Sequence, residues 1–569
     1  MEFYGQDTWK LTPRLTLDFG ARFAWYQPQY DERNQLAIFD PASYDPSQAV
    51  RLYMPAVGGG AYDPANPGAI LSGNLVGTVV PSSGNLLNGV QFASKGYFRG
   101  GWEDRGVMPE PRLGFAYALT GDGKTVLRGG AGMMHDRIQG NLIFNPVFSN
   151  PANVVTPTVS NGSLANIASL SAGSTPILGG IVGAARSGEV PTIYSFSLGI
   201  QRQLGRGTTI DVAYVGSLSR HLVTARNINQ LPYGTAFTAT AQDPSKYSGG
   251  VVPGVEPDLP AAYSKAGYNY SGNYALDAPF LVPYRGYSYI EYYRFDGTSN
   301  YNSLQVSVQR RFSRGLTFGV AYTYSKTLTT ANRDEDWQDA FNPRKYDYRV
   351  AEWDRPHVLV FNYVYDLPNV TKRFGGPKWL SSITDNYQLS GITTFESGAP
   401  IDPGLWWSPA MTINGTYNAW WIGWTRAYVY PTIEGGVDKS VGTSNFDPGA
   451  FRAPPVGVPP GPSRSSLRGG GMQNWDMSLF KNIALGSNEQ RFMQLRLEAF
   501  NVFNHPNFQN VNLNWTVNPP SGTSPPTLAI NTRPAGDTAL YGSYFGEYSN
   551  TYYGNGGSRV VQLALKIYF

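Results

Sequence analysis

Apolar side chains fall on every second position through many short segments, and this period constrains the fold more than any other feature of the chain. In LTFGVAYTYS, apolar or aromatic residues alternate from Leu316 to Tyr324 with small or polar residues. A period of two puts successive side chains on opposite faces of an extended chain, so each such segment is predicted to be a β-strand with one apolar face. Such a face contacts either a protein core or lipid.

The same pattern predicts thirteen strands. They cover residues 2–10, 14–26, 110–119, 125–137, 191–203, 208–223, 301–312, 315–328, 355–367, 384–397, 473–483, 491–504 and 558–569. In the last of these, Val561, Leu563, Leu565, Ile567 and Phe569 form the apolar face, and Gln562 and Lys566 belong to the other face.

Tight turns and long connections alternate between the predicted strands. The tight turns are LTPR, TGDGK, LGRG, FSRG and ALGSNEQ, whereas the long connections are rich in Gly, Pro, Asn, Ser and Tyr. The long connections cover residues 26–109, 138–190, 224–299, 330–353, 398–472 and 505–557. This asymmetry is typical of outer-membrane barrels, which have short periplasmic turns and long extracellular loops.

Other classes fit the sequence less well. A soluble β-sandwich or propeller also has alternating strands, but here the apolar faces carry almost no charge and the strand spacing is irregular. Only 15% of residues are charged, against about 25% in a typical soluble domain. No apolar run is long enough for a transmembrane helix.

Charge and cysteine content exclude further kinds of site. The net charge of +4 includes no basic block, which argues against nucleic-acid binding. The absence of cysteine excludes disulfides and thiolate metal sites.

The prediction is therefore all-β: a transmembrane antiparallel β-barrel in the outer membrane. Thirteen is an odd number, and an odd number of strands does not close an antiparallel bacterial barrel. We therefore expect residues 1–569 to be the C-terminal part of one barrel domain, with earlier strands, a plug and an N-terminal domain lying outside this sequence. The opening segment MEFYGQDTWK does not have the composition of a signal peptide.

Several blocks resemble the Oar-like group of TonB-dependent outer-membrane receptors, which carry a carboxypeptidase-regulatory-like domain. They are FYGQDTWKLTPRLTLDFGARF, YSFSLGIQRQLGRGTTIDVAYVGSLSRHL, NYNSLQVSVQRRFSRGLTFGVAYTYSK, YQLSGITTFESGAP, LRGGGMQNWDMSLFKN and RLEAFNVFNHPNF. The resemblance implies a barrel of 22 strands with a plug, of which the thirteen here would be the last. It also implies energised uptake through the TonB complex in the full-length protein. The ending VQLALKIYF resembles the signal read by the barrel-assembly machinery, with Phe569 as its final residue.

No pattern of catalytic residues is present, and we expect no enzyme activity, no cofactor and no metal. The four histidines, His135, His221, His357 and His505, lie on separate segments without metal-ligand spacing. The acidic loop RDEDWQD offers hard oxygen ligands for Ca²⁺ from Asp334, Glu335, Asp336 and Asp339, but its spacing is not that of an EF-hand and charged loop tips are usually just solvated.

One long connection is unusually rich in tryptophan. The candidate ligand-binding residues there are Trp406, Trp407, Trp420, Trp421 and Trp424. Their rings could stack on a carbohydrate or an aromatic ligand, or they could pack on one another as a small loop core. The function expected is ligand binding by extracellular loops of a TonB-dependent receptor. The alternative is a passive porin-like channel or a surface-adhesion barrel.

Overall fold

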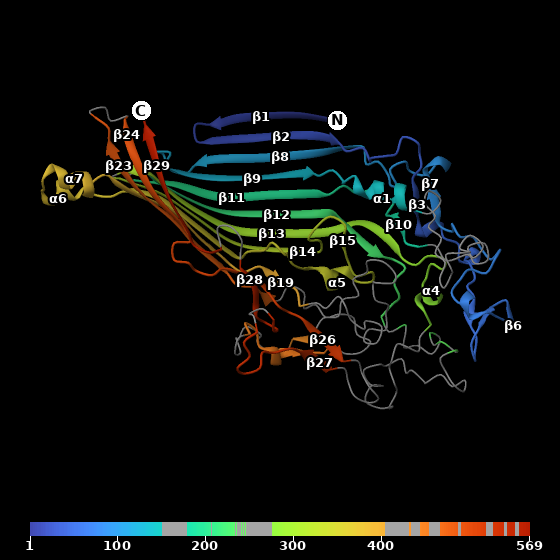
Figure 1. Cartoon of the computed structure of the whole chain (residues 1–569). Helices are drawn as coiled ribbons and strands as arrows, with labels where there is room; N and C mark the ends of the chain where they lie inside the picture. The colour runs from blue at the N-terminus through green and yellow to red at the C-terminus, as the bar shows by residue number, and fades with distance from the viewer. Residues whose placement is uncertain are drawn as a thin grey trace.

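A large antiparallel sheet with long connections at one end makes up the structure (Figure 1). The computed structural model describes residues 1–150, 179–205, 207–233, 235, 241, 243, 245, 276–313, 315–403, 432–433, 444–453, 467–486, 491–518, 527–539, 543–551 and 557–569. The wall strands are β1 (Glu2–Thr12), β2 (Leu15–Trp25), β8 (Val107–Ala118), β9 (Thr125–His135), β11 (Thr192–Leu204), β12 (Thr208–Asn227), β13 (Ile290–Ser313), β14 (Leu316–Thr329), β17 (His357–Asp366), β18 (Tyr387–Glu396), β23 (Met472–Ala484), β24 (Phe492–Phe500) and β29 (Val560–Tyr568).

Each wall strand pairs antiparallel with the next one along the chain, so all thirteen predicted strands are confirmed. Among the described strands no pairing joins β1 to β29, and the sheet is open. Because thirteen strands alternate in direction, β1 and β29 run the same way, and an antiparallel ladder between them is impossible.

The two faces of the wall differ in chemistry, as the alternation predicts. Leu497 of β24 lies opposite Leu563 of β29, and the two side chains are 43% and 82% exposed on the outward face. On the other face Glu498 lies opposite Gln562 and accepts a hydrogen bond from it. The outward face carries many exposed leucines and aromatic rings, so it has the character of a wall that contacts lipid.

At the end of the sheet that carries the short turns, one connection differs from the prediction. β17 and β18 are joined by two helices rather than by a plain turn, α6 (Val370–Phe374) and α7 (Lys378–Thr384). Thr371 donates its main-chain N–H and its hydroxyl to the Asp385 carboxylate, which clamps the two helices together. Figure 1 shows this helical hairpin beyond the strand ends, on the side opposite the long connections.

Strands β12 and β13 are longer than predicted and extend as a ribbon past the wall. The ribbon bends at His221, whose φ of 58° lies in the left-handed region, where the β12–β13 register shifts. Gly297 faces this bulge so closely that a Cβ there would lie 2.8 Å from the Leu222 carbonyl oxygen. The extension was missed because its residues are held by packing against distant loops rather than by local alternation.

Smaller elements build two lobes at the end with long connections. The first lobe contains β3 (Ala37–Phe39), β4 (Met54–Pro55), β5 (Ala61–Asp63), β6 (Asn66–Leu71), β7 (Val90–Phe92), α1 (Asn141–Ser149), β10 (Ile181–Ala184) and α4 (Ala278–Leu281). The second contains β19 (Pro400–Ile401), β20 (Thr432–Ile433), β21 (Phe451–Arg452), β22 (Leu467–Arg468), β25 (Phe508–Val511), β26 (Trp515–Asn518), β27 (Thr527–Ile530) and β28 (Tyr548–Thr551). Between them lie β15 (Asp336–Trp337), α5 (Pro343–Asp347) and β16 (Arg349–Val350).

Candidate functional site: the long-loop platform

The first lobe has a hydrophobic core of its own, built from three connections that are far apart in sequence. Leu36 and Trp102 of the first long connection pack with Val182 of the second and with Phe295 of the β13 extension. The Trp102 and Phe295 rings meet edge to face with centroids 5.4 Å apart. Burial of this apolar surface gives the connections a fixed shape instead of leaving them as separate solvated loops.

A fully buried asparagine joins the first two long connections. The Asn150 amide donates to the carbonyl oxygens of Ala37 and Val182 at 2.6 and 2.9 Å, and its Oδ1 accepts the Val182 N–H at 2.7 Å. Because Ala37 belongs to β3 and Val182 to β10, this one side chain spans two strands of the lobe. Its loss would leave buried main-chain groups without partners.

A charged cluster lies where the lobe meets the wall. Glu110 is 4% exposed; its carboxylate accepts the His135 N–H at 2.9 Å and lies 3.2 Å from the Arg22 Nε. Arg22 also donates to the Tyr26 hydroxyl at 2.8 Å. The first long connection follows β2 and the second follows β9, so the cluster ties the starts of both connections to β8.

The local sequence explains why Glu110 takes this role. Its neighbours Pro109 and Pro111 have no N–H, and the described β8–β9 ladder begins only at the next pair, Arg112 with Gly132. The Glu110 carboxylate then supplies the acceptor for His135 where the ladder has stopped. The sequence reasoning missed this residue, although a Pro-Glu-Pro triplet inside a strand is a signal that could have found it.

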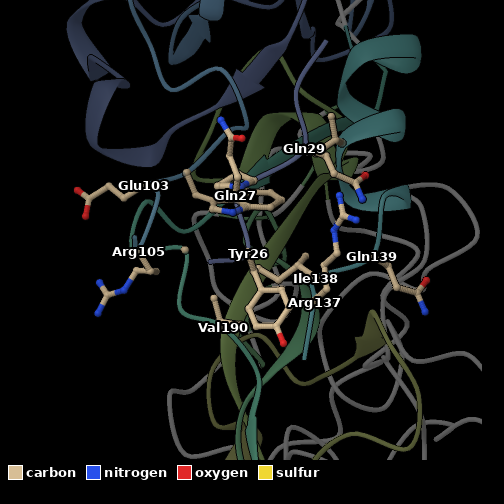
Figure 2. Close-up of a pocket in the computed structure, with 13 residues that line it drawn as sticks. Tyr26, Gln27, Gln29, Glu103, Arg105, Arg137, Ile138, Gln139 and Val190 are labelled. Carbon is tan, nitrogen blue, oxygen red and sulfur yellow. The ribbon is translucent and has the colours of Figure 1, made fainter. Parts of the chain in front are cut away.

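A small cavity lies beside this cluster, between Tyr26, Trp102 and Ile138 (Figure 2). Its volume of about 10 Å³ is that of a single water molecule, too small for a ligand. Figure 2 shows Glu103 and Arg105 pointing away from the Tyr26 ring. The cavity is therefore a packing gap and not a binding pocket. We call the two lobes, together with the connection 330–356 between them, the platform.

The second lobe is formed by the last two long connections. Its core contains Phe451, Leu467, Trp515 and Phe545, and the Trp515 indole donates to the Pro403 carbonyl oxygen at 2.8 Å. A buried ion pair strengthens the lobe. Glu547, 1% exposed, accepts two hydrogen bonds from Arg533 at 2.6 and 2.9 Å.

Residues 330–356 connect the two lobes. Asp336 and Trp337 pair in parallel with Thr224 and Ala225 of β12, on the side of the first lobe. On the other side, Arg468 of the second lobe donates to the Asp354 carboxylate at 2.6 Å. The two lobes are thus braced through one connection.

Two of the four acidic residues considered for calcium, Asp336 and Asp339, accept hydrogen bonds from the chain. The Asp339 carboxylate accepts the main-chain N–H groups of Phe341 and Asn342 and the Tyr233 hydroxyl. Burial raises the pKa of Glu335, and the charge of Asp334 raises it further. Within the described part of the chain, no group of three or more histidine or acidic side chains could hold a metal ion.

The other predicted residues have different outcomes. The five candidate tryptophans, Trp406, Trp407, Trp420, Trp421 and Trp424, lie outside the described residues. The histidines stay on separate segments, and His357 bonds the Tyr322 hydroxyl through Nδ1 at 2.9 Å. The terminal Phe569 is fully exposed just after β29.

Comparison with known proteins decides the family. The profile of the outer membrane beta barrel domain matches residues 1–562. The chain belongs to this family. The predicted fold class and the predicted location in the outer membrane are therefore confirmed, and the long connections of the barrel are its extracellular loops.

Solved structures that resemble the barrel are receptors and transporters of the outer membrane. The ferric-catecholate import receptor Fiu from Escherichia coli K12 is 11% identical, with 93% of this chain and 43% of that chain covered and a TM-score of 0.34. The siderophore receptor PiuA from Acinetobacter baumannii is 8% identical, with 100% and 43% covered and a TM-score of 0.36. The chain thus spans less than half the length of these two receptors.

No curated protein sequence matches the chain. Among the residues that the structure describes, no helix is both long and apolar enough to cross a membrane.

Proposed function

We propose that the chain supplies wall strands and the extracellular platform of a TonB-dependent receptor that captures a ligand at the cell surface and imports it. The proposal rests on one observation above all. The extracellular loops form two braced lobes, with buried bonds at Asn150, Glu110 and Asp354. Loops held in fixed positions suit selective binding, because little conformational entropy remains to be lost on capture.

The open sheet supports a larger receptor. The free edges of β1 and β29 would leave main-chain groups unpaired in lipid, and each such group costs several kcal/mol. Further strands must cover these edges for the wall to be stable. The Oar-like sequence blocks favour a full barrel with a plug, which is the part that would contact the TonB complex.

Conductance measurements in planar lipid bilayers test the energised mechanism. The full-length protein, purified from outer membranes, should show no steady open channel, because a plugged receptor opens only when TonB pulls on it. The matched control is the same protein with the plug deleted, which should conduct. Steady conductance of the full-length protein without any energy source would instead establish a passive channel.

We also propose that the tryptophan-rich loop contributes to the ligand site. Replacing Trp420, Trp421 and Trp424 together with Ala should abolish binding of an oligosaccharide probe, measured by saturation-transfer NMR against a panel of sugars. Trp379→Ala is the matched control, since Trp379 lies on α7 at the opposite end of the wall. Equal binding by the triple variant and the parent would exclude this loop as the sugar site.

Phe569 is proposed as the residue that the barrel-assembly machinery reads. Its ring is fully exposed, so the folded protein does not need it for packing. Phe569→Ala should lower the amount of protein in the outer membrane while leaving the unfolding transition of the assembled fraction unchanged. Normal membrane levels of this variant would remove the role.

A further inference from the structure

An apolar groove lies on the outward face of the wall, across β18, β23, β24 and β29. It encloses about 450 Å³, and leucines from three of these strands line it. They are Leu479, Leu495, Leu497, Leu563 and Leu565. Since this face contacts membrane lipid elsewhere on the wall, the groove is continuous with the lipid-facing surface.

A lysine lies at one end of this groove. Lys481 is the direct register partner of Tyr387 and of Leu495, so its side chain starts on the outward face, three residues before β23 ends at the short turn. The side chain is 8% exposed. Its ammonium donates to the Asp385 carbonyl oxygen and lies 4.8 Å from the centre of the Tyr387 ring. The Asp385 carboxylate itself accepts two hydrogen bonds from Thr371, so Lys481 bonds only the main-chain oxygen of that residue, and an ammonium has three donors.

The adjacent helical hairpin has the composition of a membrane interface. Phe374, Trp379 and Ile383 are 77%, 66% and 59% exposed. The same hairpin carries Lys372 and Arg373, and the Arg373 guanidinium lies 5.6 Å from the centre of the Phe374 ring. Tryptophan with basic residues is the typical combination at the level of lipid headgroups. Figure 1 shows the hairpin at the end of the wall opposite the long connections, which in an outer-membrane barrel is the periplasmic end. The leaflet at that end of an outer membrane consists of glycerophospholipids.

We propose that the groove binds one glycerophospholipid of the periplasmic leaflet, with an acyl chain along the leucines and the phosphate on Lys481. The lysine stem lies among apolar side chains while its ammonium reaches the headgroup level. The exposed rings of the α6–α7 hairpin lie in the same headgroup layer and hold the periplasmic rim at a fixed depth. This site is independent of the ligand bound by the extracellular loops.

Native mass spectrometry of the full-length protein in detergent tests the proposal, with added phosphatidylglycerol as the probe. The variant is Lys481→Met, which keeps the length and apolar character of the stem. The matched control is Lys566→Met. Lys566 lies two strands further along the sheet, on β29, and at a similar depth, because its partner Gln494 is next to Leu495, the partner of Lys481. Its side chain faces the lumen instead of lipid. A difference in gel migration between heated and unheated samples verifies that each variant is a folded barrel.

Lys481→Met should weaken phosphatidylglycerol binding by about fivefold, the effect of one basic side chain near a lipid surface, and Lys566→Met should leave it unchanged. Lys481→Arg should restore binding. Diacylglycerol with the same acyl chains should bind the parent protein as weakly as phosphatidylglycerol binds the Met variant, and inorganic phosphate should not displace the lipid. The proposal is overturned if both lysine variants behave alike, if diacylglycerol binds as well as phosphatidylglycerol, or if phosphate displaces the lipid.

Discussion

The Glu110 carboxylate accepts the main-chain N–H of His135 at 2.9 Å and so replaces a ladder bond at the point where the described β8–β9 pairing has ended. The same carboxylate lies 3.2 Å from the Arg22 Nε. One side chain therefore holds the starts of two extracellular loops.

Glu110→Gln should destabilise the barrel by about 2 kcal/mol, because a buried charge-assisted bond is lost while the shape of the side chain is kept. Urea unfolding in lipid vesicles, followed by tryptophan fluorescence, measures the difference. Glu2→Gln is the control, since Glu2 contacts the same Arg22 from an exposed position and should cost nothing measurable. Equal effects of the two changes would contradict a special role for Glu110.

Asp354→Ala should loosen the contact between the connection at 330–356 and the second lobe. The Asp354 side chain is fully buried; one carboxylate oxygen accepts the Thr327 N–H at 2.7 Å, and the other accepts from Arg468. We expect the free energy of local opening to fall by about 2 kcal/mol, so hydrogen exchange of the Thr327 amide should become about 30-fold faster. Glu352→Ala, at a 62% exposed carboxylate, should not alter that amide.

Glu291 should make the extracellular platform less stable at higher pH. It lies on β13 beyond the bend at Gly297, where burial, and then the charge of Glu335, raises its pKa from 4.5 to about 7. Between these two values the folded state binds more protons than the unfolded state. Stability should therefore fall as pH rises from 4.5 to 7 and stay constant above, by about 3 kcal/mol in total.

Glu291→Gln removes this loss, so the variant should be more stable than the parent at pH 8 and similar to it at pH 4.5. Urea unfolding at several pH values between these limits measures the slope. Glu103→Gln, at an exposed position of the same lobe, is the control and should keep the parent's slope. A parental slope in the Glu291 variant would show that another group titrates.

A charge on the outward face should be far more costly than one on the lumen face. Leu198, near the middle of β11, is 52% exposed on the outward side, and its neighbour Ser197 points the other way. Leu198→Arg should lower the free energy of unfolding in vesicles by about 2 to 4 kcal/mol, whereas Ser197→Arg should change it by less than about 1 kcal/mol. The reverse order would mean that the two faces have been assigned the wrong way round.

The strands were predictable because their signal is local. Alternation within about ten residues assigns each strand and its two faces, and the final strand follows it from Val561 to Ile567. The same reasoning failed for the β17–β18 connection and for the ribbon at Ile290, since neither depends on alternation of its own residues. The candidate site was less predictable still, because the tryptophan loop was chosen by composition alone.

The sequence by itself determined a thirteen-stranded, lipid-facing antiparallel wall, since a period of two and the spacing of turns are properties of neighbouring residues. Only the tertiary structure decided which loops pack together and which polar residues brace them. Asn150 contacts Ala37 across 113 positions, and Arg468 contacts Asp354 across 114. Contacts at such separations leave no periodic trace in the chain, because they are selected by burial and charge pairing after the wall has brought the loops to one end.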